Sequence, residues 1–316
     1  MAPRLAPGLA VALSLVLATA ACSGDDDGGG DGSDGGDDGA DGGSGDDGGG
    51  EPAPTPAEGQ FMVLESSFGD GAEGYGVISG AILDPRPTFH RLDMESGACK
   101  LWLYEPVDCS PCDGICDSEG ECVPFPTSLS AGTVTVTTPG GEVVMPASEY
   151  GYYPEGPVPE DLFESGDPVV ADADGGEIAA FALETEGVDP ISLDLVAGGE
   201  SGADTLRLED GADLELSWDG AEAGRRVRLQ IKSNNQGHGQ PVLALIDCEG
   251  DDTGSLTVPR AMIEAFPEKP YQNICAGVDC PPSSLMRFTR ARTALGDLTM
   301  ELVAGFERQF IVVHEP

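Results

Sequence analysis

The sequence predicts an all-β protein, with two β-sandwich modules that follow a signal peptide and a disordered tether rich in Asp and Gly. Gly and Pro, which both destabilise helices, account for 46 and 25 of the 316 residues. From residue 59 onward, roughly sixteen short runs of β-forming residues are separated by turn signals about every eight to twelve residues. Because strands do not alternate with helices, the pattern favours β-sandwiches over an α/β fold.

Residues 1–21 have the layout of a cleaved signal peptide. The apolar run at residues 9–17 (LAVALSLVL) is too short to cross a bilayer as a stable helix. Small residues then lead to Cys22 in LATAAC, which resembles a lipobox, although Thr19 stands where that motif usually has Leu. We therefore predict cleavage before Cys22 and acylation of its thiol. Ordinary signal cleavage after residues 18–20 (ATA) is the alternative.

Residues 22–58 are expected to form a disordered tether. Residues 23–50 contain only Gly, Asp, Ser and one Ala, so no apolar side chain can start a core. Repulsion between the Asp residues extends the run, and the Pro-rich residues 51–58 stiffen its end. Calcium-dependent folding of the Asp-Gly run is the alternative, but calcium-binding solenoids need regularly placed apolar residues, which this run lacks.

The cysteines predict a disulfide framework. The chain has nine, and setting Cys22 aside leaves eight that an exported protein would pair: Cys99, Cys109, Cys112, Cys116, Cys122, Cys248, Cys275 and Cys280. The connectivity stays open, with Cys275 and Cys280 expected to pair locally or with Cys248. Zinc is the alternative at the Cys109-x2-Cys112 spacing, but thiols oxidise outside the cytoplasm. We predict no metal and no cofactor.

The first β module is expected at residues 59–188, with a Cys-rich loop at 99–122. Strands are predicted near residues 61–64, 75–83, 100–104 and 178–183. A hairpin is predicted where residues 133–137 (TVTVT) meet 142–145 across Pro139-Gly140-Gly141. The module is expected to end near residues 188–190, where a second run of strands begins.

The second β-sandwich module is expected at residues 189–316. Its clearest signal is residues 213–232, where two runs of period two flank a loop at 219–224. The polar face of the first run is acidic and that of the second is basic, so we predict an antiparallel hairpin with the two faces in contact. One or two helical turns are predicted at residues 259–266. Further strands are predicted at 191–196, 242–248, 256–258, 285–292, 298–303 and 310–314.

Three groups of side chains are candidate sites. Tyr150, Tyr152 and Tyr153 could stack on sugars or anchor a protein partner, although packing beneath a loop is the preferred interpretation. Acidic turns are alternative calcium sites but lack a full ligand spacing: Asp172, Asp174 and Glu177, and the pair Asp251 and Asp252. His90, His238 and His314 are far apart in sequence, and no G-x-S-x-G motif occurs, so no catalytic residues are predicted.

Several stretches together resemble a group of predicted surface lipoproteins of large-genome Gram-negative bacteria. They are residues 130–136 (SAGTVTV), 166–168 (GDP) running to 179–181 (AAF), 214–218 (LELSW), and 246–248 (IDC) leading to 253–259 (TGSLTVP). The resemblance covers most of residues 20–316 and implies an outer-membrane or cell-surface lipoprotein with β-sandwich modules. The strand that ends at Trp218 is also similar to early strands of fibronectin-type and immunoglobulin-like modules.

These observations predict a non-enzymatic, lipid-anchored protein of the cell envelope that acts as an interaction or structural module. Its expected partners are the membrane, through the lipid, and a protein or glycan of unknown identity. Nucleic acid is excluded, because 57 acidic against 15 basic residues give a net charge of -42. A glycan- or calcium-binding module is the first alternative, and a hydrolase with an unrecognised site is the second.

Overall fold

A computed structural model of the chain describes residues 59–68, 74–84, 88–193, 204–234, 241–269 and 282–315. Regular structure in these ranges is almost all β-strand, with one short helix, which confirms the all-β class. None of the helical structure in these ranges is long and apolar enough to span a membrane. The signal peptide, Cys22, the tether, His238, Cys275 and Cys280 lie outside the described residues.

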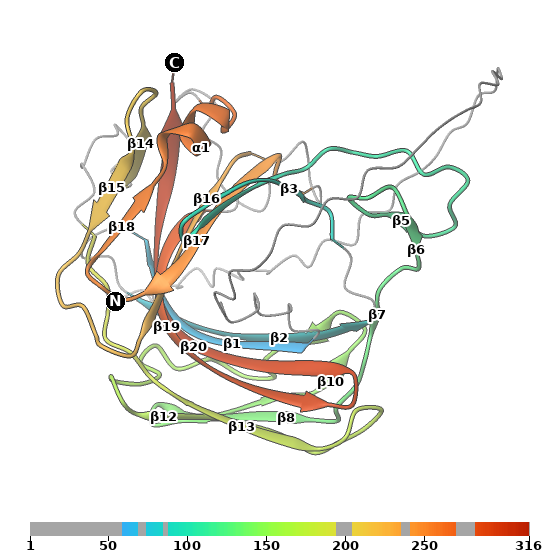
Figure 1. Cartoon of the computed structure of the whole chain (residues 1–316). Coiled ribbons are helices and arrows are strands. Elements are labelled where there is room, and N and C mark those ends of the chain that lie inside the picture. The colour runs from blue at the N-terminus through green and yellow to red at the C-terminus, as the bar shows by residue number, and fades with distance from the viewer. Residues whose placement is uncertain are drawn as a thin grey trace, which may run out of the picture.

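The described chain forms twenty strands and one helix (Figure 1). Their bounds are β1 (Gly59–Phe68), β2 (Tyr75–Asp84), β3 (Arg91–Ser96), β4 (Cys99–Leu103), β5 (Ile115–Cys116), β6 (Cys122–Val123), β7 (Thr127–Ser128), β8 (Val134–Thr138), β9 (Gly141–Met145), β10 (Ala147–Ser148), β11 (Gly151–Tyr152), β12 (Pro168–Ala173), β13 (Phe181–Glu186), β14 (Thr205–Leu208), β15 (Leu214–Ser217), β16 (Arg226–Lys232), β17 (Ala244–Asp251), β18 (Ser255–Val258), α1 (Arg260–Ala265), β19 (Ser283–Leu295) and β20 (Leu298–His314).

A twelve-stranded sheet forms the frame of the molecule. Its main path is β10-β11-β2-β1-β20-β19-β16-β17-β4-β3, with β7 paired to β2 and β14 paired to β20. The long hairpin of β19 and β20 turns at Gly296, whose positive φ of 66° favours glycine. The sheet bends, so that β1, β2 and the hairpin end lie along the lower part of Figure 1 and β16, β17 and β3 rise above them.

Two large hydrophobic cores pack against this sheet, beside a small cluster around Phe288. The first lies between its lower part and the four-stranded sheet β13-β12-β8-β9, and includes Phe61, Val136 and Leu302. The second lies between its upper part, including β14, and the elements β15, β18 and α1, and includes Ile246 and Phe310. Period-two alternation explains both, because the odd or even residues of each strand share one face.

The boundary expected near residue 188 separates two cores but not two sheets. Val188 belongs to the first core and Ile191 to the second. However, β4 contributes Leu101 to the second core, and β20 contributes Met300 to the first. The two expected modules therefore share the twelve-stranded sheet, because β1 pairs in parallel with β20 at its centre.

One predicted hairpin is confirmed and the other is wrong. Strands β8 and β9 pair across the Pro139-Gly140-Gly141 turn, as expected. Residues 213–232 do not form a hairpin, because β15 pairs with β18 while β16 lies between β17 and β19. The basic face of β16 meets carboxylates of β17 instead, and Arg228 binds Asp247 through two bonds of 2.7 and 2.6 Å. The predicted helical turns are confirmed as α1, which follows Pro259.

Candidate functional site

Three disulfides hold the described chain, which confirms the pairing of six of the eight expected cysteines. Cys99 and Cys248 face each other on β4 and β17, are fully buried, and are separated by 149 residues. Cys248 is therefore not the partner of Cys275 or Cys280, which corrects one of the two expected options. Cys109 pairs with Cys116 and Cys112 pairs with Cys122, closing loops within the Cys-rich segment.

Residues 105–126, named here the disulfide loop, lie apart from the two cores (Figure 1). Its short hairpin of β5 and β6 places Cys116 opposite Cys122. The Asp117 carboxylate accepts bonds of 2.9 Å from the backbone N–H groups of Glu119 and Glu121, which fixes the turn. Phe125 in this loop is 45% exposed. The loop is thus a braced projection and not part of a core.

The sulfur atoms of Cys109, Cys112 and Cys116 lie within 4.8 Å of one another. In the oxidised loop they belong to two disulfides, so they offer no thiolate to a metal. The disulfide interpretation of this segment is therefore the one that the structure bears out. No other group of described His, Cys, Asp or Glu side chains has metal-ligand spacing.

The three candidate tyrosines have different surroundings. Tyr152 is fully buried, packs edge-on against Phe61 at 5.3 Å, and accepts a 2.6 Å hydrogen bond from the Ala131 N–H. It therefore presents no ring to a ligand, as the packing interpretation expected. Burial raises the pKa of Tyr152. Tyr150 is 53% exposed, and the Tyr153 hydroxyl donates to its carbonyl at 3.2 Å. Tyr150 therefore has the most accessible ring of the three, and Tyr153 is half-buried.

Of the acidic residues considered for calcium, three have protein partners, namely Glu177, Asp251 and Asp252, while Asp172 and Asp174 are exposed. Glu177 accepts a 2.9 Å bond from the Ser130 N–H and braces the loop before β8. Asp251 pairs with Arg226 at 3.2 Å, while Asp252 is buried. None of these carboxylates belongs to a described cluster with metal-ligand spacing.

Asp252 belongs to a buried ionic cluster that the sequence did not reveal. Arg287, 1% exposed, lies on β19 between the two cores, where its Nε donates to Asp252 at 2.7 Å and its Nη1 to Glu222 at 3.0 Å. The Trp218 indole N–H also donates to Asp252, at 2.7 Å. The remaining guanidinium hydrogens bind backbone carbonyls of Asp189, Pro190 and Gly220. We name this set the Arg287 network.

The Arg287 network fixes the crossing between the two cores. Arg287 donates to the segment at residues 189–190, which connects the cores, and to the loop that follows β15. Burial acts to raise the pKa of Asp252, but bonds from the Glu222 N–H, Trp218 and Arg287 outweigh it and lower that pKa overall. The network is thus saturated with internal partners, which assigns it to the architecture and not to ligand binding.

The two described histidines, His90 and His314, each lie close to a backbone carbonyl. His90 Nε2 lies 2.8 Å from the Val242 carbonyl, and burial lowers its pKa. His314 lies 3.2 Å from Asp210, but it is 3% exposed and its other ring nitrogen faces the Pro267 carbonyl at 3.2 Å. Neither His314 nor Asp210 lines the two described surface hollows.

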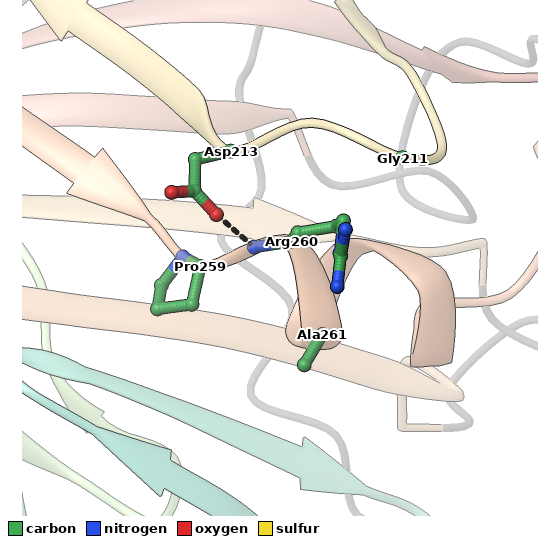
Figure 2. A pocket seen from close by; sticks show the side chains of 5 residues that line it. All are labelled: Gly211, Asp213, Pro259, Arg260 and Ala261. Carbon is green, nitrogen blue, oxygen red and sulfur yellow. Dashed lines mark hydrogen bonds between the residues drawn. The ribbon is translucent and has the colours of Figure 1, made fainter.

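The larger hollow, of about 430 Å³, lies where the loop before β15 meets the start of α1 (Figure 2). Its lining residues Gly211, Asp213 and Arg260 are exposed, and Asp213 accepts a 2.7 Å bond from the Arg260 backbone N–H at the start of the helix. Arg260 also pairs with Glu264 at 3.5 Å. Asp213 and Arg260 already stabilise the end of the helix, so neither charged side chain of the hollow is left available for a ligand.

The smaller hollow, of about 280 Å³, lies near the bend of the large sheet. Its three arginines are all ion-paired: Arg225 with Glu186 at 2.7 Å, and Arg226 and Arg290 with Glu249 at 2.9 Å each. Arg290 also lies over the Phe288 ring, 5.7 Å from its centre. Asp251, which also pairs with Arg226 at 3.2 Å, supplies a third carboxylate, so the hollow carries no excess positive charge that would recruit an anion. Comparison of the chain with protein-family models, curated proteins and solved structures finds no match.

Proposed function

We propose that the protein is a lipid-anchored cell-surface protein whose disulfide-bonded β module acts as a non-catalytic interaction or structural unit. The observation that carries the proposal is the set of three disulfides, since such bonds persist in exported proteins and are rare in the cytosol. The lipobox-like sequence before Cys22 supplies an anchor, and the acidic tether at 22–58 supplies distance from the membrane.

The geometry of the described side chains favours an interaction or structural role over catalysis. The polar groups at both hollows have protein partners, and in the close His314–Asp210 pair the histidine is buried, although the carboxylate is half-exposed. A reacting site needs accessible groups whose partners leave them available to a substrate. The exposed aromatic rings of Phe125 and Tyr150 are instead the kind of side chain that anchors a macromolecular partner.

The anchor is tested with a Cys22→Ala variant expressed in a Gram-negative host. We expect it to leave the membrane fraction, because it lacks the acylated thiol. Thr19→Leu, which restores the usual lipobox residue, is the matched control and should remain at the membrane. Intact mass of the purified control should show acyl chains on an N-terminal Cys22. Unchanged anchoring of Cys22→Ala would refute the proposed topology.

Glycan binding is a second candidate, favoured by the exposed Tyr150 ring. Exposed aromatic rings offer a flat apolar face to sugars. A panel of surface polysaccharides, with and without calcium, would be tested for retention of the full chain. Tyr150→Ala should lose retention, while Phe125→Ala, an exposed aromatic on the disulfide loop, should keep it. Equal retention of the two variants would show that the Tyr150 ring does not bind the polysaccharide.

A further inference from the structure

The disulfide loop gathers three sulfur atoms in one small volume, with a fourth, that of Cys122, bonded to one of them. The sulfurs of Cys109, Cys112 and Cys116 lie within 4.8 Å of one another, and Cys122 joins the group through its bond to Cys112. The first three side chains are half-buried and Cys122 is exposed, so a small solute can reach them. By contrast, the Cys99–Cys248 disulfide is fully buried in the second core.

Backbone N–H groups point at two of these sulfurs. The Cys109 N–H donates to the Cys116 sulfur at 3.2 Å, and the Gly114 N–H donates to the Cys112 sulfur at 3.3 Å. Hydrogen bonds to a sulfur favour its charged thiolate form. These donors are therefore placed where they would stabilise thiolates once the disulfides open.

The scaffold that holds the sulfurs does not consist of disulfides alone. The Asp117 N–H donates to the Glu121 carbonyl at 3.0 Å, and the Asp117 carboxylate caps the same turn. The Ser118 N–H donates to the Thr88 carbonyl at 2.8 Å, which fastens the tip to the segment before β3. These bonds act on the backbone, so reduction leaves them in place and keeps the thiols close.

Four clustered thiolates are a ligand set for a soft divalent cation. Tetrahedral zinc has Zn–S distances of about 2.3 Å, which place neighbouring sulfurs about 3.8 Å apart. The two bonded pairs, with sulfurs about 2.0 Å apart in a disulfide, must open by about 1.8 Å to reach that geometry. The other separations among Cys109, Cys112 and Cys116, at most 4.8 Å, must close by no more than about 1 Å. We propose that, after both disulfides are reduced, the loop binds one Zn²⁺ or a similar soft cation through Cys109, Cys112, Cys116 and Cys122.

The chemistry balances with a thiol or phosphine reductant. Each disulfide takes up two electrons and two protons and gives two thiols. The electrons and protons come from two reductant thiols, which become a disulfide, or from one phosphine and one water molecule, which together give the phosphine oxide. Binding of the cation by four thiolates then releases up to four protons to solvent. Reoxidation expels the cation, so oxidised and metal-bound states exclude each other.

The test uses Co²⁺ as a coloured probe with the full chain. Mild phosphine should reduce the two disulfides of the loop and spare Cys99–Cys248, which alkylation and peptide mapping would verify. We expect one equivalent of Co²⁺ to bind only after reduction, giving thiolate-to-cobalt charge-transfer and tetrahedral d–d absorption that Zn²⁺ displaces. Absence of these bands from the reduced chain would overturn the proposal.

Matched variants assign the ligands. Cys109→Ser/Cys116→Ser and Cys112→Ser/Cys122→Ser each remove one whole disulfide and leave two sulfurs, so each should weaken Co²⁺ binding about 100-fold or more. Cys275→Ser/Cys280→Ser is the control and should retain full binding. Retention by both loop variants, or loss in the control alone, would refute the assignment. Near-UV circular dichroism checks that the cores stay folded, and the Cys22 anchoring test is independent of either result.

Discussion

Replacement of Arg287 by Met is expected to destabilise the fold more than replacement of any exposed charged residue. Arg287 is 1% exposed, and the carboxylate of Asp252 that it neutralises has no exposed surface at all. Its removal leaves that carboxylate without a cation and three backbone carbonyls without their donor. Breaking one side of a buried ion pair costs about 3–5 kcal/mol, and the retained Trp218 bond keeps the loss within that range.

Urea unfolding measures this change. Trp218 donates to Asp252, so its fluorescence reports on the network, and a Trp102→Phe background removes the second signal. The matched control is Arg207→Met, which breaks a half-exposed pair with Glu315 and should cost less than about 1 kcal/mol. Adding Asp252→Asn to Arg287→Met should recover part of the loss, because the unpaired charge disappears. A loss from Arg287→Met no larger than that of the control would refute the reasoning.

Three further changes test other parts of the structure. Burial lowers the pKa of Lys269 from 10.5 to about 8, so the folded state binds this proton more weakly than the unfolded state. Lys269 should therefore raise the free energy of unfolding by up to about 3 kcal/mol between pH 8 and 10.5, and Lys269→Met should remove this contribution in urea titrations, leaving that of Lys232, whose pKa burial also lowers. Cys99→Ala/Cys248→Ala should lower the free energy of unfolding by about 5 kcal/mol, given the 149-residue separation; a loss below 2 would contradict the loop-entropy argument. Tyr152→Phe leaves the buried Ala131 N–H without its acceptor and should cost about 1–3 kcal/mol without changing glycan retention.

The features that could be predicted from the sequence are those that depend on residues close together in the chain. Period-two alternation identified which residues of β16 face the core, and the Pro139-Gly140-Gly141 turn identified the partner of β8. Turn residues specify a neighbour because only two or three residues separate the strands. By the same logic, the eight cysteines predicted disulfides, since their oxidation depends on compartment and not on fold.

Long-range pairing was beyond local patterns. Charge complementarity suggested that 213–217 would face β16, but β17 supplies carboxylates of the same kind and lies beside β16 in the sheet. The Arg287 network could not be predicted either. In the sequence, Arg287 resembles any other charged residue of a strand. Its partners come from segments 35 to 98 residues away, which local patterns do not connect to it.

The parallel pairing of β1 with β20 has a consequence for the order of folding. Gln60 and Glu301 are paired neighbours although 241 residues separate them. The pairing at the centre of the large sheet can therefore form only after nearly the whole chain has been made. Such non-local contacts slow folding, because the loop-closure entropy is lost before the contacts form. Until β20 is available, β1 and β19 keep open edges that can pair with other chains. Because synthesis starts at the N-terminus, the growing chain exposes these edges, and it must remain protected from aggregation until β20 has been made.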